Sequence, residues 1–138
     1  IEQIQTTITN GRKGMMTSHA ATLSEAEIDT LAAYVVGLSE GKSDEKGKAL
    51  FQSKACFACH GMDAKGMAAL GSANLTDGIW RFESDDLLAS AKLTIAHGVN
   101  AAGDAKTRNA EMPAFKDKLS EADIKKMAVY VYKFGGGK

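Results

Sequence analysis

A short sequence pattern occurs twice in this chain, and it constrains the fold more than any other feature. The first copy, LSEAEIDTLAAYVVGL, begins at Leu23, and the second, LSEADIKKMAVYVYKF, begins at Leu119, ninety-six positions later. In each copy the serine can cap a helix, and apolar residues follow at the spacing of an amphipathic helix. The pattern therefore predicts two equivalent helices, each with one apolar face.

The rest of the chain also indicates helices joined by loops. Helical periodicity is present in three further segments, residues 1–11, 43–54 and 84–98. Residues 61–82 have neither the helical nor the strand period and are expected to form a loop. No convincing alternating strand pattern is found, so the predicted fold class is all-α.

Composition and charge exclude several classes of protein. No apolar run approaches the roughly 20 residues of a membrane span. No basic region followed by an apolar run opens the chain, so any signal peptide or membrane anchor is expected to lie outside it. The net charge is zero, with three excess acidic residues in 1–40 and three excess basic residues in 41–138. This balance lacks the basic excess of a nucleic-acid-binding protein.

One motif in the chain strongly indicates a particular kind of chemical site. Cys56-Phe-Ala-Cys59-His60 has the spacing of a c-type haem attachment site. On a helix, positions i, i+3 and i+4 lie on one face. Two thiols there can form thioethers with the haem vinyl groups while the histidine points at the iron. The motif predicts one covalent haem c, with His60 as an iron ligand.

Two other kinds of site could in principle use the same two cysteines. A zinc site would need a second pair of ligands, and the sequence contains only these two cysteines. A thioredoxin-like redox pair would need a βαβ context, which the helical pattern does not supply. Both alternatives are weaker than haem attachment.

A second axial ligand would decide what the haem can do. The other candidates are six methionines and two histidines, His19 and His97. Met112 stands in the loop just before the last amphipathic helix, and Pro113 stiffens that loop so that it can hold a thioether against iron. We therefore expect Met112 to be the second iron ligand.

The other candidates have simpler explanations. Met127 lies on an apolar helix stripe, where a core role is expected. Met62 and Met67 follow Cys59 too closely to reach the opposite side of a haem. His97 stands at the end of a helix, where capping and the helix dipole account for it.

At this point the residues resemble a known family. The resemblance covers nearly all of the chain and is carried by LFQSKACFACHGMDAKG, LGSANLTDGIW, TIAHG, EMPAF and the last helix. These segments are similar to a class I cytochrome c domain, and more closely to the dihaem subunit III of cbb3-type cytochrome c oxidases. The resemblance implies an electron carrier with His/Met ligation that delivers electrons within or to a respiratory terminal oxidase. Its partners would be other cytochromes or oxidase subunits.

The resemblance also implies a domain organisation. Residues 41–138 match a complete cytochrome c domain, whereas residues 1–40 match only the closing half of a preceding one. Met16 then stands where Met112 stands in the second copy, with Thr17 in place of the proline. We expect a fragment of a longer dihaem protein, which the family anchors in the membrane on the periplasmic side. The alternative is a natural monohaem cytochrome with a helical extension.

Further site residues are implied by the resemblance alone. The family usually has proline where this chain has Ala73, whose carbonyl would accept a hydrogen bond from His60; without the proline, loop rigidity is in question. Leu75 belongs to the expected haem wall. Trp80 and Arg81 would lie near the haem propionates, although simple burial and solvation are the competing explanations.

Helix packing and assembly follow from the same resemblance. Gly47 and Phe51 are expected to pack against Tyr130 at the helix crossing of class I cytochromes. The apolar stripes of residues 1–40 are expected to pack against residues 41–138 or against another chain, so self-association is an expected property. A rival to the electron carrier is an enzyme or ligand sensor whose distal ligand is loosely held or absent.

Overall fold

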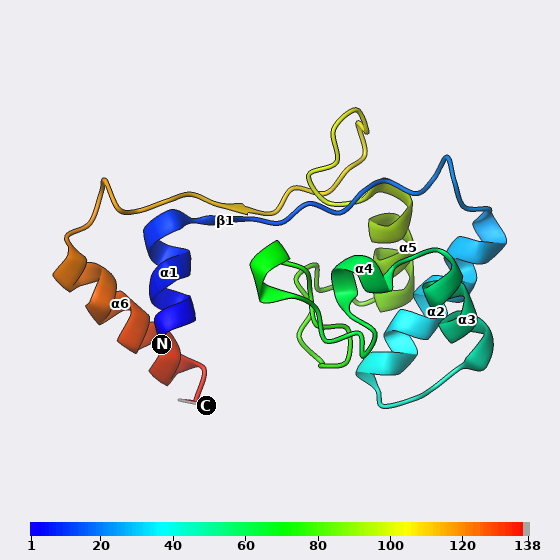
Figure 1. Ribbon diagram of the computed structural model, residues 1–138, viewed down its shortest axis with the longest axis horizontal. Helices are drawn as coiled ribbons and strands as arrows, with labels where there is room; N and C mark the ends of the chain where they lie inside the picture. Colours follow the sequence, from blue (N-terminus) through cyan, green and yellow to red (C-terminus); the bar gives the residue numbers. More distant parts are fainter. Residues whose placement is uncertain (137–138) are drawn as a thin grey trace. The chain divides into compact units, whose positions relative to one another are not determined.

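The structure, a computed structural model, describes residues 1–136 and is built from helices (Figure 1). The helices are α1 (Glu2–Asn10), α2 (Glu25–Ser39), α3 (Glu45–Ser53), α4 (Phe57–His60), α5 (Leu87–His97) and α6 (Glu121–Phe134), with a 3₁₀ turn, η1, at Ala68–Leu70. Two short strands, β1 (Arg12–Lys13) and β2 (Glu111–Met112), form an antiparallel pair that the sequence did not predict. The all-α class is confirmed.

The helices begin where the capping residues predict. Ser24 accepts a hydrogen bond from the Glu27 backbone N–H, and the Glu27 carboxylate accepts one from the Ser24 N–H, which completes the capping box. Ser120 caps α6 in the same way through the Asp123 N–H. At α5 the cap is Asp86, whose carboxylate accepts from the Ala89 N–H at 2.9 Å.

The chain forms two compact units that do not follow the order of the sequence. The central unit contains Gly14–Asn109, and the terminal unit combines Ile1–Lys13 with the chain from Ala110 onward. The terminal unit therefore joins the two ends of the described chain, and the central unit contains the motif together with the first copy of the repeated helix.

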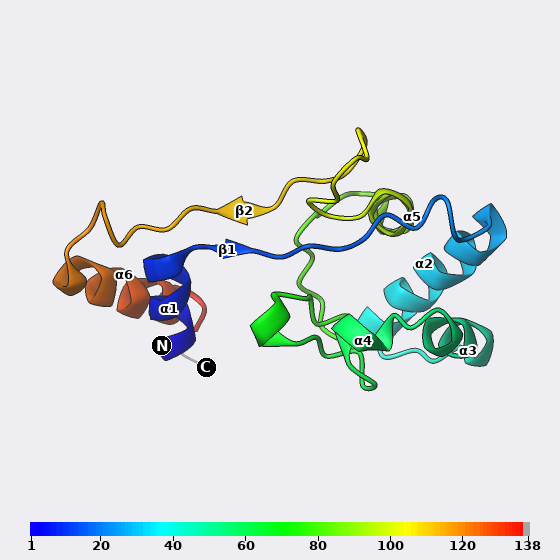
Figure 2. The same ribbon diagram turned by 45° about the horizontal axis from the view of Figure 1, so that its top comes forward.

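In the central unit, α2 packs against both α3 and α5 (Figure 2). The core of this unit contains Leu23, Leu31, Ala32, Tyr34, Phe51, Ala64, Ala91 and Ile95. Leu31 is the most completely buried large side chain among the described residues, with 2% of its surface exposed. The apolar face of α2 is therefore covered by α3 and α5, the helices on either side of the motif.

In the terminal unit, α1 packs against α6, and the two helices lie side by side in Figure 1. Ile8 of α1 is buried against Ile124 and Ala128 of α6. The β1–β2 pair extends this contact and places Arg12 opposite Met112. The prediction that the apolar stripes of residues 1–40 pack against the rest of the chain is confirmed, by α2 in one unit and α1 in the other.

One packing prediction is wrong. The aromatic partner of α3 is Tyr34, whose ring centroid lies 5.8 Å from that of Phe51. A Cβ added at Gly47 would lie 2.7 Å from Tyr34 Cγ, so glycine is needed for this close approach. Tyr130, the expected partner, is 64% exposed. Tyr34 and Tyr130 hold equivalent places in the repeated pattern, so the pattern alone did not determine which of them packs against α3.

Candidate functional site

The haem attachment motif forms a single turn of helix. Cys56 is the N-cap of α4, and both Cys59 and His60 donate backbone hydrogen bonds to its carbonyl, at 3.3 Å and 3.1 Å. Gly61 ends the turn with a positive φ of 80°. The two thiols and the imidazole therefore belong to one turn, as the spacing predicts.

The environments of the two cysteines differ. Cys56 is half-buried and packs against the core of the central unit, and this burial raises the pKa of its thiol. Cys59 is exposed. The two sulfurs form no disulfide, so both thiols are available to form thioethers.

The imidazole of His60 is oriented by the backbone. Its Nδ1 lies 3.1 Å from the Ala73 carbonyl oxygen, the hydrogen bond that the resemblance implies. A carbonyl only accepts, so Nδ1 carries the proton and Nε2 keeps its lone pair. Burial lowers the pKa of His60, which favours the neutral ring that a metal requires.

The loop that supplies this carbonyl is held without proline. Leu75 donates its N–H to the Ala64 carbonyl at 2.8 Å, and Asn74 accepts from the Thr76 N–H at 2.9 Å, forming a side-chain turn. Gly66, which donates to the His60 carbonyl at 2.7 Å, also allows the loop to approach closely. These hydrogen bonds hold the loop in place although Ala73 stands where the family usually has proline.

Of the remaining site residues implied by the resemblance, all but Met112 lie in the central unit, which also holds the motif. Leu75 and Trp80 are half-buried and pack on the central core, and Arg81 is exposed. Arg108, which the sequence did not single out, is more firmly placed: its guanidinium lies 4.5 Å from the centre of the Phe82 ring. Met112 is the exception, because it belongs to the terminal unit.

The residues of the motif fit a covalent haem. Two free thiols and an imidazole with an available nitrogen lie on one turn, beside apolar side chains that include Phe57, Leu75 and Trp80. Among residues 1–136 no group of three or more His, Cys, Asp or Glu side chains is arranged to hold a metal ion directly. Two thiols and one imidazole nitrogen on a single turn are the groups that a covalently attached haem needs from the protein.

The comparisons with known proteins bear on this site. A sequence model of the family described as "Cytochrome C oxidase, cbb3-type, subunit III" matches residues 1–35 and 42–131. The chain belongs to the cbb3-type cytochrome c oxidase subunit III family. The matched residues include the whole motif and most of both copies of the repeated helix.

Curated relatives in this family are moderately similar. The cbb3-type cytochrome c oxidase subunit FixP of Azorhizobium caulinodans is 37% identical over 99% of this chain, and FixP of a Bradyrhizobium species is 39% identical over all of it. Subunit CcoP of Rhodobacter capsulatus is 37% identical over 83% of the chain. The chain spans about half the length of the two FixP relatives.

None of the helices within residues 1–136 combines the length and the apolar character needed to cross a bilayer.

Two methionines of this subunit III domain occupy equivalent loops in different units. Met16, in the central unit, pairs with Val99 through two backbone hydrogen bonds of 2.9 Å and 3.0 Å and packs against the buried core of that unit. Met112, in the terminal unit, packs against the cluster of Ile8 and Ile124. Met16 is the counterpart of Met112 in the repeated pattern, and the sequence favours Met112 as the ligand because Pro113 stiffens its loop whereas Thr17 follows Met16.

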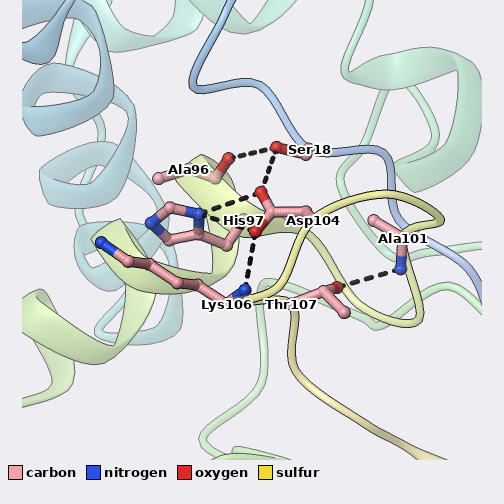
Figure 3. Close-up of polar contacts among 7 residues, drawn as sticks. All are labelled: Ser18, Ala96, His97, Ala101, Asp104, Lys106 and Thr107. Carbon is pink, nitrogen blue, oxygen red and sulfur yellow. Dashed lines mark hydrogen bonds and ion pairs between the residues drawn. The ribbon is translucent and has the colours of Figure 1, made fainter.

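A polar cluster anchors the Met16 loop to the end of α5 (Figure 3). Asp104 is its centre: its carboxylate accepts from Ser18 Oγ at 2.7 Å and lies 3.0 Å from His97 Nδ1. The backbone N–H of Lys106 also donates to it, at 2.8 Å. The Ser18 hydrogen bond is the largest cause, followed by His97, that lowers the pKa of Asp104 from 3.8 to about 2.

This cluster makes a prediction about acid stability. The pKa of Asp104 is lower in the folded protein, so its stabilising contribution is complete above about pH 4 and is lost as the pH falls towards 2. Replacing Ser18 with alanine should raise the pKa of Asp104 and move acid unfolding to a higher pH. Far-UV circular dichroism during an acid titration measures this shift.

The control is Ser53→Ala, because the Ser53 hydroxyl bonds only to the Leu50 carbonyl of its own helix. Its acid transition should match that of the unsubstituted protein. An unchanged transition in Ser18→Ala would mean that the Ser18–Asp104 hydrogen bond contributes nothing to acid stability.

Proposed function

We propose that this chain is an electron-transfer domain that carries one covalent haem c. The observation that supports it best is the single turn bearing Cys56, Cys59 and His60, with His60 oriented by the Ala73 carbonyl at 3.1 Å. When bound, the haem supplies an iron that holds and releases one electron. The chain's own residues would attach it, orient it and set the ligands that tune it.

Each residue of the motif has a distinct role in this proposal. Cys56 and Cys59 hold the haem through thioether bonds, and His60 binds the iron through Nε2. The hydrogen bond to Ala73 fixes the ring orientation and increases the basicity of the histidine ligand. Leu75 and Trp80, which pack on the apolar core, would line the haem and keep water from it.

The second ligand in this proposal is a methionine. A His/Met pair fills both axial positions, so it leaves no open position for a substrate, and the thioether raises the reduction potential. The sequence prediction assigns this role to Met112, in the loop stiffened by Pro113. Met16, its counterpart in the repeated pattern, packs against the core of the central unit.

The parent protein would use this domain within a larger assembly. The relatives are named as subunits of cbb3-type cytochrome c oxidase, which supports oxidase subunits or other cytochromes as electron partners. By the family resemblance, we propose that the domain works on the periplasmic side of the membrane and that the parent protein carries a membrane anchor. Trp80 and the exposed Arg81 are proposed to lie near the haem propionates.

Covalent attachment is the test of this function. The purified protein should carry a mass excess of one haem and should stain for haem after denaturing electrophoresis. A Cys56→Ala, Cys59→Ala double variant should lose both signals, because no thiol remains in the chain to form a thioether. Ser53→Ala, three residues before Cys56, serves as the control and should keep both.

Haem that separates from the unsubstituted polypeptide on denaturation would refute the proposal. An enzyme or ligand sensor is distinguished by a different measurement. The electron carrier should bind neither CO in the reduced state nor peroxide in the oxidised state, since both axial positions are filled. Rapid binding of either would favour the sensor or enzyme.

A further inference from the structure

We propose that Ser72 is a positioning residue for His60: its hydroxyl ties the loop that carries the Ala73 carbonyl to the haem attachment turn. The inference rests on the proposed function, because it concerns haem bound at His60. It assigns to Ser72 the restraint for which the family usually has proline at position 73. All of the residues involved belong to the central unit.

The Ser72 hydroxyl joins two segments of the chain. It donates to the Cys59 carbonyl oxygen at 2.5 Å, and it accepts from the Met67 N–H at 2.8 Å. A hydroxyl has one proton and two lone pairs, so it can make both hydrogen bonds at once. Ser72 therefore links α4 to the start of η1, and it directly precedes the residue whose carbonyl oxygen lies 3.1 Å from His60 Nδ1.

The hydrogen bond to Cys59 also completes the end of the attachment turn. The last carbonyl groups of a helix have no partner within the helix. In α4 the His60 carbonyl accepts from the Gly66 N–H at 2.7 Å, and the Cys59 carbonyl accepts from Ser72. The same loop thus caps two successive carbonyls of the turn, one through its backbone and one through a side chain. Removing the hydroxyl would leave one of these two ties.

The backbone of the loop is closely packed at the same place. A Cβ added at Gly66 would lie 2.6 Å from the Ser72 carbonyl oxygen and 2.7 Å from the Ala73 carbonyl oxygen. The Gly66 backbone therefore lies against the carbonyl group that orients His60. The position of this carbonyl depends on two kinds of contact, the packing of Gly66 and the hydrogen bonds of Ser72.

The residue at position 73 explains why a hydroxyl is needed next to it. Alanine does not fix φ, so the chain at Ala73 has a freedom of rotation that proline would remove. Among the hydrogen bonds of residues 1–136, none has the Ala73 N–H as its donor, so a proline there would lose no hydrogen bond. Either a ring at position 73 or hydrogen bonds from position 72 can restrain this loop, and this chain has the second.

The position of the Ala73 carbonyl bears on the electronic properties of the histidine. The hydrogen bond that Nδ1 of His60 donates makes the imidazole more basic, and a more basic ligand favours the oxidised iron. Without the Ser72 hydroxyl, the Ala73 oxygen should move away from Nδ1 for part of the time. The reduction potential should then rise, and the Nδ1 proton should exchange with solvent faster.

The test compares variants of the haem-loaded full chain. Ser72→Ala should keep covalent haem, raise the reduction potential and increase the exchange rate of the His60 Nδ1 proton about fivefold, the factor that corresponds to one ordinary hydrogen bond. Ser72→Thr keeps the hydroxyl and should match the unsubstituted protein in both quantities. Ser84→Ala is the matched control, because the Ser84 hydroxyl accepts from the Asp86 N–H, at 3.2 Å, before α5.

Proline at position 73 provides a second comparison. Ala73→Pro should leave the exchange rate of the Nδ1 proton unchanged or lower it. Ser72→Ala should have a smaller effect in the Ala73→Pro background, because the ring then supplies the restraint. Equal effects in the two backgrounds, unchanged values in Ser72→Ala, or the same changes in Ser72→Thr as in Ser72→Ala would each overturn the inference.

A further measurement uses the unsubstituted protein, so it does not depend on the folding of a variant. One opening of the loop should expose both the Met67 amide and the His60 Nδ1 proton, and their protection from exchange should fall together as denaturant is added. An unprotected Met67 amide beside a protected Nδ1 proton would overturn the inference while leaving haem attachment intact. Absence of covalent haem from the unsubstituted protein would instead refute the proposed function, and the inference with it.

Discussion

Replacing Leu31 with alanine should lower the free energy of unfolding by about 2–5 kcal/mol, the range for removing a large aliphatic side chain from a packed core. Leu31 is 2% exposed and lies in the core of the central unit. The shortened side chain would leave a cavity beneath α2 that its neighbours fill only in part. Denaturant unfolding of the haem-loaded protein, followed by far-UV circular dichroism, measures the change.

Met127→Ala is the matched control for this variant. Met127 holds the corresponding place on α6 and is 47% exposed, so its truncation should change the free energy of unfolding by about 0.5 kcal/mol or less. If residues 110–138 closed the motif domain instead, Met127 would occupy the core position. The large loss would then appear in Met127→Ala and the small one in Leu31→Ala.

The second large effect is expected at the crossing of α2 and α3. A Cβ at position 47 would lie 2.7 Å from Tyr34 Cγ and 2.9 Å from the Asp44 carboxylate. Gly47→Ala should therefore lower the free energy of unfolding by about 1–3 kcal/mol, as overpacking of a tight contact does. Thermal unfolding of the variant and the unsubstituted protein provides the comparison.

Two further variants make this prediction specific. Gly37→Ala lies in α2, where an added Cβ would approach only Lys42 Cβ, at 3.6 Å. It should raise the free energy of unfolding by about 0.5–1 kcal/mol, because alanine loses less entropy in a helix than glycine. Tyr34→Ala should relieve the clash, so Gly47→Ala should cost less in the Tyr34→Ala background. Equal costs in the two backgrounds would mean that Tyr34 is not the residue that Gly47 accommodates.

The sequence alone was sufficient for the local structure, since local structure depends on neighbouring residues. Ser24 and Ser120 predicted where α2 and α6 begin, because a capping serine needs only the backbone N–H groups of the next turn. The Cys56–His60 spacing predicted that thiols and imidazole share one turn for the same reason. The all-α class and the subunit III family follow from these local features.

Local rules were less reliable at the edges of the elements. Ser84, Asp85 and Asp86 all lie at the expected start of α5, and only the folded backbone shows that Asp86 is the residue that caps it. The β1–β2 pair joins residues about one hundred positions apart and has no alternating pattern of its own. No short window of sequence contains the information for that pairing.

Only the tertiary structure decided which copy of the closing half lies against the motif. Residues 23–38 and 119–134 have the same capped amphipathic pattern, so the pattern alone does not show which of them packs against α3 and α5. The residues that differ include Asp29, which pairs with Lys92, Ser18, which donates to Asp104, and Gly14, which lies close to Gly71. These partners are distant in sequence and come together only when α5 and its loops have folded. The repeated pattern predicted two equivalent amphipathic helices, and only contacts between residues distant in sequence place the first of them, α2, against α3 and α5.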